Sequence, residues 1–256
     1  MVQSRRMSSS GARATALVEE LRGLGSERNR EGMARYAIHT EHAFGVSVPV
    51  LRAIAKRIGA DHDLAIDLWK TGNHEARLLA CFVDDADAVS EDQLEAWSRD
   101  FDSWDICDQA TTSLFDRSRY AWPKAVEWAT RDDLWVKRGG FALMAGLAVH
   151  DRSAADAKFQ ALLPIIEGGA WDERNFVKKA VNWALRNVGK RNVRLNGDAI
   201  ASAERIRAAA NERAGGERGG APAVRSARWV ASDALRELTS DAVSVRLHKT
   251  PRVRLK

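Results

Sequence analysis

Cysteine, tyrosine and proline are scarce in this chain, whose 256 residues contain two cysteines, two tyrosines and five prolines. Cys81 and Cys107 both fall within helical patterns, so we expect buried thiols rather than a disulfide or a metal-binding pair. No apolar run reaches the roughly 18–20 residues that a membrane-spanning helix needs. The arginine- and serine-containing start has no apolar stretch after it, which argues against a secretory signal. Together these absences predict a cytoplasmic protein.

Strand signals and cofactor motifs are also missing. β-Branched residues are thinly spread, and no Asn-Gly turn lies between alternating segments, whereas alanine, leucine, arginine and glutamate dominate. This composition favours helices. The chain has no GxxxxGK[ST] loop, no HExxH and no cysteine pairs spaced for zinc. We therefore expect an all-α protein with no metal and no nucleotide cofactor.

The charge is unevenly distributed along the chain. Residues 170–256 contain 19 basic and 9 acidic residues, whereas residues 1–169 contain 21 basic and 26 acidic residues. A basic half of this strength favours a polyanionic partner, although a solvated basic surface with a basic tail is an equal alternative on composition alone.

A degenerate repeat predicts the architecture. Short polar turns lead into helices that carry Arg77, Cys107, Arg138 and Lys179 in the same phase, 30, 31 and 41 residues apart. That interval is the length of one helix pair in HEAT-like proteins. We therefore predict an α-α superhelix (solenoid) of HEAT-like repeats with a concave basic face.

The ends of the chain and one internal segment depart from this pattern. Residues 1–11 lack it and are predicted to be disordered, and residues 12–240 are predicted to form a single repeat domain. Glycines at the density found in residues 214–222 predict a flexible loop within that domain. Residues 241–256 are predicted to be a basic tail.

The first candidate site is Trp104 and Asp108. A spacing of four residues places an aromatic plane and a carboxylate on one face of a helix, near its start. The alternative is structural: a core tryptophan beside an aspartate that stabilises the helix dipole.

A second candidate site is a cationic stripe on the helix predicted from residue 175 to residue 188. Lys179, Trp183, Arg186 and Lys190 share one face of this helix, so cations surround an aromatic ring as on a surface that follows a nucleic-acid backbone. An amphipathic helix with a sideways-packed tryptophan is the alternative.

A third group extends the cationic surface. Lys137 and Arg138 stand at the repeat position that Lys179 occupies later in the chain, and cations there are expected to contact phosphates.

These residues carry a resemblance to a known family. The chain resembles the DNA alkylation repair family of AlkD-like glycosylases over roughly residues 12–240. The resemblance rests on residues 103–108, 134–138 and 175–186, with a weaker match at Tyr36 and residues 44–52.

The resemblance implies an activity and a set of roles. Such enzymes release cationic N3- or N7-alkylated purines by cleaving the N-glycosidic bond. The catalytic tryptophan and aspartate of the family fall on Trp104 and Asp108, its DNA-contacting arginine on Arg138, and its second cleft tryptophan on Trp183. Tyr36 falls where the family has a DNA-contacting tyrosine. The Gly-rich insertion and the basic tail depart from the family pattern.

Three hypotheses follow. The first is a monomeric, metal-independent glycosylase that acts on alkylpurines in double-stranded DNA. The second is a non-catalytic module that binds damaged or structured DNA, in which Asp108 is incidental. The third is a HEAT-type scaffold for proteins, which predicts no affinity for DNA at low salt.

Overall fold

A computed structural model describes residues 9–214 and 220–248 of the chain. These residues form fourteen α-helices and one short 3-10 helix, with no strand among them, which confirms the predicted all-α class. Contacts between backbone positions divide the chain into two compact units, residues 1–121 (unit 1) and 122–256 (unit 2). The sequence had predicted a single domain over residues 12–240.

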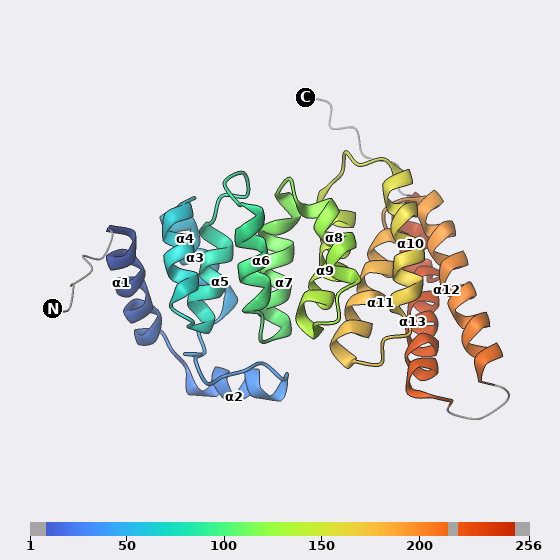
Figure 1. Cartoon of the computed structure of the whole chain (residues 1–256), viewed down its shortest axis with the longest axis horizontal. Coiled ribbons are helices and arrows are strands. Elements are labelled where there is room, and N and C mark those ends of the chain that lie inside the picture. Colours follow the sequence, from blue (N-terminus) through green and yellow to red (C-terminus); the bar gives the residue numbers. More distant parts are fainter. Residues whose placement is uncertain (1–8, 215–219, 249–256) are drawn as a thin grey trace. The chain divides into compact units, whose positions relative to one another are not determined.

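Unit 1 is built of helices that pack in successive layers (Figure 1). Helix α5 packs against α4, α3 and α7, and α1 covers α4. The helices of this unit are α1 (Ser9–Gly23), α2 (Glu27–Arg35), α3 (Val48–Ile58), α4 (His62–Lys70), α5 (His74–Val83), α6 (Glu91–Arg99), α7 (Trp104–Ser113) and the 3-10 helix η1 (Phe115–Arg117).

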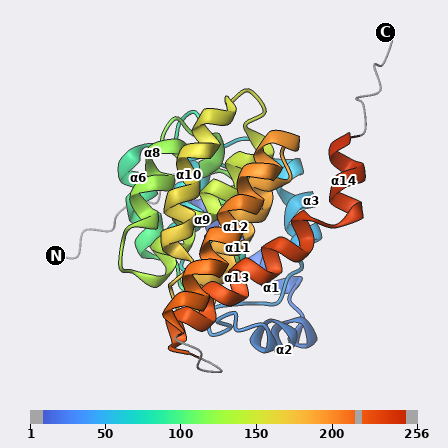
Figure 2. The same ribbon diagram turned by 90° about the vertical axis from the view of Figure 1, so that its right-hand side faces the viewer.

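Unit 2 repeats the arrangement with longer helices. Helix α11 packs between α9 and α13, and α12 packs against both α10 and α13, so two layers of helices run through the unit. Figure 2 shows α12 and α13 along one side, with α14 following α13. The helices are α8 (Ala121–Ala129), α9 (Leu134–His150), α10 (Asp156–Gly169), α11 (Asn175–Gly189), α12 (Val193–Arg213), α13 (Pro222–Leu238) and α14 (Asp241–His248).

Local sequence fixes where many of these helices begin. Asp61 accepts a hydrogen bond from the main-chain N–H of Leu64 at the start of α4. Asp133 does the same for two N–H groups at the start of α9. Such side-chain caps satisfy donors that have no partner within the helix. The short polar turns of the sequence therefore set the phase of the repeat.

Several tryptophans belong to the core rather than to a site. The rings of Trp69 and Trp97 stack with centroids 4.0 Å apart, and Trp128 is fully buried. Both cysteines are free and buried, which confirms the expectation of buried thiols. A Cβ atom at Gly140 would lie 2.3 Å from the main-chain nitrogen of Ala129. The close contact between α8 and α9 therefore requires glycine at this position.

The helices near the two ends of the chain differ in part from the predictions. Helix α1 begins at Ser9, inside the segment 1–11 that was predicted to be disordered, and α14 occupies the first half of the predicted basic tail. Helix α12 ends at Arg213 and α13 begins at Pro222, and most of the predicted loop 214–222 falls outside the described residues. Residues 1–8, 215–219 and 249–256 lie outside the described residues.

Candidate nucleic-acid interface

Trp104 and Asp108 lie one turn apart in the first half of α7, and both side chains are half-buried. The indole Nε1 of Trp104 donates a hydrogen bond of 2.9 Å to the main-chain carbonyl of Tyr36. Tyr36 directly follows α2, and its side chain is 73% exposed. The structure thus brings two of the predicted site residues of unit 1, Tyr36 and Trp104, into contact.

A buried charge pair lies beside Trp104. Asp105 accepts a hydrogen bond from the Ser103 hydroxyl at 2.6 Å, and its second oxygen lies 2.9 Å from Nε2 of His74. Burial lowers the pKa of His74, but the hydrogen bond to Asp105 and the nearby carboxylates outweigh that effect and raise it. For Asp105, burial raises the pKa, and the hydrogen bonds from His74 and Ser103 bring it below the usual value. The pair ties the start of α7 to the start of α5.

Sequence reasoning missed this pair. His74 and Asp105 are 31 residues apart, which is the repeat interval, and each stands at the start of a helix. Side chains at equivalent positions of successive repeats can meet across the stacked helices. That register is the signal that identifies the pair.

A cavity of about 690 Å³ opens next to these groups in unit 1. Its polar lining includes His74, Asp105 and Gln109, and Tyr36 and Trp104 contribute aromatic surface. Asp108 does not line this cavity. Pockets that combine apolar surface with a few polar groups are typical ligand sites.

The cationic stripe on α11 is only partly free. Lys179 is exposed and Trp183 is half-buried. Arg186 forms an ion pair of 2.5 Å with Glu237 of α13, and Lys190 forms one of 2.7 Å with the same carboxylate. Burial raises the pKa of Glu237, but the two cations outweigh it and hold the pKa below the usual value. Two of the four residues of this stripe that were predicted to contact DNA, Arg186 and Lys190, therefore already pair with a carboxylate of α13.

Helices α11 and α13 carry matching positions at four-residue spacing. The Nζ atom of Lys178 lies 5.4 Å from the ring centroid of Trp229, and Asn182 donates to Asp233 at 2.6 Å. Together with the contacts of Glu237, these pairs form a ladder that runs in the same direction along both helices. Trp229 is 38% exposed. This cation–tryptophan pair was missed by sequence reasoning, because the spacing within each helix does not give the register between the two helices.

Lys137 and Arg138 of α9 make internal contacts. Arg138 is 5% exposed, and its guanidinium donates a hydrogen bond of 2.6 Å to the carbonyl of Phe176 in α11. Lys137 lies 3.3 Å from Asp172, a carboxylate that also pairs with Arg174 at 2.6 Å. These cations connect α9 to the start of α11.

The four repeat positions therefore differ in their environments. Arg77 donates to the carbonyl of Asp100 at 3.2 Å, Cys107 is buried, Arg138 is buried and Lys179 is exposed. The equal spacing indicates equivalent places in the repeat but does not give them equal exposure. The predicted site residues of unit 2 lie on α9 and α11, which pack together, except Lys190, which directly follows α11.

Within the described ranges 9–214 and 220–248, no helix is long and apolar enough to span a membrane. In the same ranges, no three His, Cys, Asp or Glu side chains gather in a way that would hold a metal ion.

The layered helix pairs of both units define a HEAT-like repeat protein, as predicted. The chain belongs to the family of DNA alkylation repair enzymes, whose family model matches residues 17–238. A solved structure described as "A new family of proteins related to the HEAT-like repeat DNA glycosylases with affinity for branched DNA structures" is similar with a TM-score of 0.67 and 25% sequence identity. The similarity covers 74% of this chain and 81% of that chain. No curated protein matches the chain.

Proposed function

We propose that this protein is a DNA glycosylase that hydrolyses the N-glycosidic bond of cationic N3- or N7-alkylpurines in duplex DNA. The proposal includes action as a monomer, in the cytoplasm, without a metal or nucleotide cofactor. The observation that carries it is the pairing of Trp104 and Asp108 at the start of α7, with the Trp104 indole fixed by Tyr36. Membership of the DNA alkylation repair family supports it.

The chemistry of the substrate suits a single carboxylate. An alkylated N7 or N3 makes the purine a cationic leaving group, so no strong general acid is needed. As the bond breaks, positive charge develops on the sugar, and water must attack the same carbon. Asp108 stabilises that charge and orients the water. Ordinary glycosidases need a carboxylate pair because their leaving group must be protonated.

The aromatic and cationic residues have separate roles in this proposal. Trp104 and Trp183 offer π faces to the cationic nucleoside, each worth about 0.5–2 kcal/mol. Lys179 contacts DNA phosphates directly, since its side chain is exposed. Arg138, Lys137, Arg186 and Lys190 act as phosphate contacts only if DNA competes for groups that already bind protein atoms.

The test is release of N7-methylguanine from a synthetic duplex by the wild-type protein, by Asp108→Asn and by a matched control, Asp92→Asn. Asp92 is an exposed residue of α6. We expect release by the wild type above the buffer rate and a loss of about 100-fold or more in Asp108→Asn. Asp92→Asn should match the wild type. Release by the wild type at only the buffer rate would overturn the enzymatic proposal.

A second function is favoured by the affinity for branched DNA attributed to the similar solved structure. In this alternative the protein binds structured DNA without cleaving it. It predicts tighter binding to a three-way or four-way junction than to a duplex of the same length. It also predicts no base release, and unchanged binding in Asp108→Asn. Equal affinity for junction and duplex would contradict it.

A further inference from the structure

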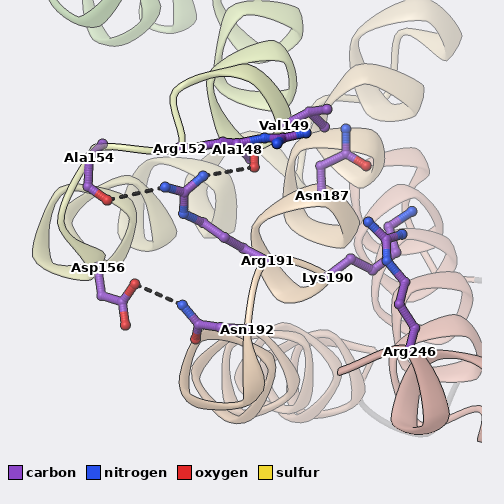
Figure 3. A pocket seen from close by; sticks show the side chains of 10 residues that line it. All are labelled: Ala148, Val149, Arg152, Ala154, Asp156, Asn187, Lys190, Arg191, Asn192 and Arg246. Atoms are coloured by element: carbon purple, nitrogen blue, oxygen red, sulfur yellow. Dashed lines mark hydrogen bonds between the residues drawn. The ribbon is translucent and has the colours of Figure 1, made fainter. Parts of the chain in front are cut away.

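A cavity of about 500 Å³ in unit 2 lies at the C-terminal end of α11, beside Asn187 and Lys190 (Figure 3). It forms where α9 and α11 end and where α10 and α12 begin, and Arg246 of α14 completes it. Its lining comes from four helices, α9, α10, α11 and α14, and from the connections after α9 and α11, so the cavity belongs to the folded unit rather than to one loop.

The lining of this cavity is strongly cationic. It contains Arg152, Lys190, Arg191 and Arg246, against a single carboxylate, Asp156. One oxygen of Asp156 accepts a hydrogen bond of 2.9 Å from the Asn192 side chain. Basic groups around a concave surface concentrate positive potential within it.

Arg191 is held rigidly by neutral acceptors. Its guanidinium donates to the carbonyls of Ala148, Asp151 and Ala154 at 3.1, 2.6 and 3.2 Å, and Figure 3 shows two of these bonds. It also lies over the ring of Phe159, 4.2 Å from the centroid. Carbonyl acceptors fix the orientation of the group but leave its positive charge uncompensated.

The other cations differ in how far they are neutralised. Lys190 pairs with Glu237 at 2.7 Å. Arg152 and Arg246 are exposed, and no ion pair of either side chain is found among residues 9–214 and 220–248. A role in binding the carbonyl ends of α9 accounts for Arg191. It does not account for Arg152 and Arg246, which both line the cavity although they are far apart in the sequence.

We propose that this cavity binds phosphate groups of a DNA backbone, as an extension of the α11 stripe. The proposal rests on the proposed DNA-binding function and specifies a further part of its footprint. Lys190 lies seven residues after Trp183, which is about 10 Å along the helix. That distance corresponds to roughly three phosphates of one strand. Guanidinium groups suit the site because they present several donors to phosphate oxygens at once.

The test compares a double variant of the cavity with a matched double variant outside it. Arg152→Ala/Arg246→Ala removes two cations from the cavity. Arg194→Ala/Arg207→Ala removes two exposed arginines of α12 that do not line it. Fluorescence polarisation with a short labelled duplex measures affinity over a series of salt concentrations, and circular dichroism confirms that all proteins are folded.

We expect the cavity variant to bind about ten-fold or more weakly near 0.1 M salt, with the salt slope reduced by about 1.8. The α12 variant should retain the wild-type affinity and slope. Wild-type binding by the cavity variant, or equal losses in both variants, would overturn the cavity proposal while leaving the proposed function intact. Absence of DNA binding by the wild-type protein would instead overturn the proposed function, and the cavity proposal with it. Inorganic phosphate, added at constant ionic strength, should compete only weakly, because the proposed ligand is an extended backbone.

Discussion

The indole N–H of Trp104 is bonded to the carbonyl of Tyr36, 68 residues earlier in the chain. The bond joins the first residue of α7 to the residue that follows α2. Ala37, the next residue, adopts a φ of 56°, a left-handed conformation that is uncommon for alanine. The backbone there turns tightly, and this turn presents the Tyr36 carbonyl to the indole. The orientation of the proposed catalytic tryptophan thus depends on a distant segment.

The first prediction concerns this hydrogen bond. Trp104→Phe keeps an aromatic face but has no N–H donor, so it should lose the hydrogen bond that orients the ring, which is worth about 1 kcal/mol. Release of N7-methylguanine should fall about five-fold in Trp104→Phe, and further in Trp104→Ala because the π face is also lost. Single-turnover base release measures both effects.

A matched control for this prediction exists in unit 2. Trp122 donates its indole N–H to Asp151 at 2.9 Å, far along the chain from α7. Trp122→Phe should reduce stability by a similar amount without changing the rate of base release. If Trp104→Phe releases base as fast as the wild type, the indole hydrogen bond has no role in the reaction.

Much of the helical framework was predictable from the sequence. The helix expected over residues 175–188 begins at Asn175 as expected and ends one residue later, at Gly189. Capping residues and apolar periodicity are local signals, so they fix where such helices begin and which face is buried.

The pairing partners and the burial of the charged side chains were not predictable in the same way. Sequence spacing placed Arg186 and Lys190 on one face of α11, and they are on one face. It did not reveal that Glu237, 51 residues after Arg186, binds both cations. Nor did it reveal that Arg138 is buried against Phe176. Pairing across helices depends on tertiary register, which one helix's periodicity does not contain.

The second prediction concerns the carboxylate that binds these cations. Glu237→Gln removes its charge, so Lys190 loses its carboxylate partner and Arg186 keeps only the longer pair of 3.5 Å with Asp233, which makes both more available to phosphates. DNA affinity should rise, and the salt slope should steepen by up to about 1.8. The free energy of unfolding should fall by only about 0.5–1 kcal/mol, since the ion pairs are partly exposed. Fluorescence polarisation and urea unfolding measure the two effects.

Glu212→Gln is the control for this charge change. Glu212 is an exposed residue near the end of α12, and its loss alters net charge equally. A larger gain in DNA affinity for Glu237→Gln than for Glu212→Gln supports the availability of Arg186 and Lys190. Equal gains would mean that only net charge matters, and that these two cations are structural.

The third prediction is a dependence of stability on pH that arises from His74 and Asp105. The pKa of His74 is raised in the folded protein from the ordinary value of 6.5. Its contribution to stability is therefore complete below about pH 6 and is lost as the pH rises through the raised pKa. The pKa of Asp105 is lowered from 3.8, so its contribution is present above that pH and is lost as the pH falls through the lowered value.

The loss of stability at high pH and the loss at low pH both arise from this one buried pair. Substitution of His74 should therefore remove the loss at high pH. The thermal midpoint of the wild type should fall as the pH rises from 6 to 9. His74→Gln should lack that fall, whereas His39→Gln, which changes an exposed histidine, should retain it.

His74→Ala should lower the free energy of unfolding by about 3 kcal/mol or more at pH 6, because Asp105 then remains buried without its partner. A wild-type thermal midpoint that does not change between pH 6 and pH 9 would contradict the prediction, because it would show that the charges of His74 and Asp105 do not change over this range. Because Asp105 lies between Trp104 and Asp108 on α7, base release should also decline over the same alkaline range, and the decline should be absent from His74→Gln.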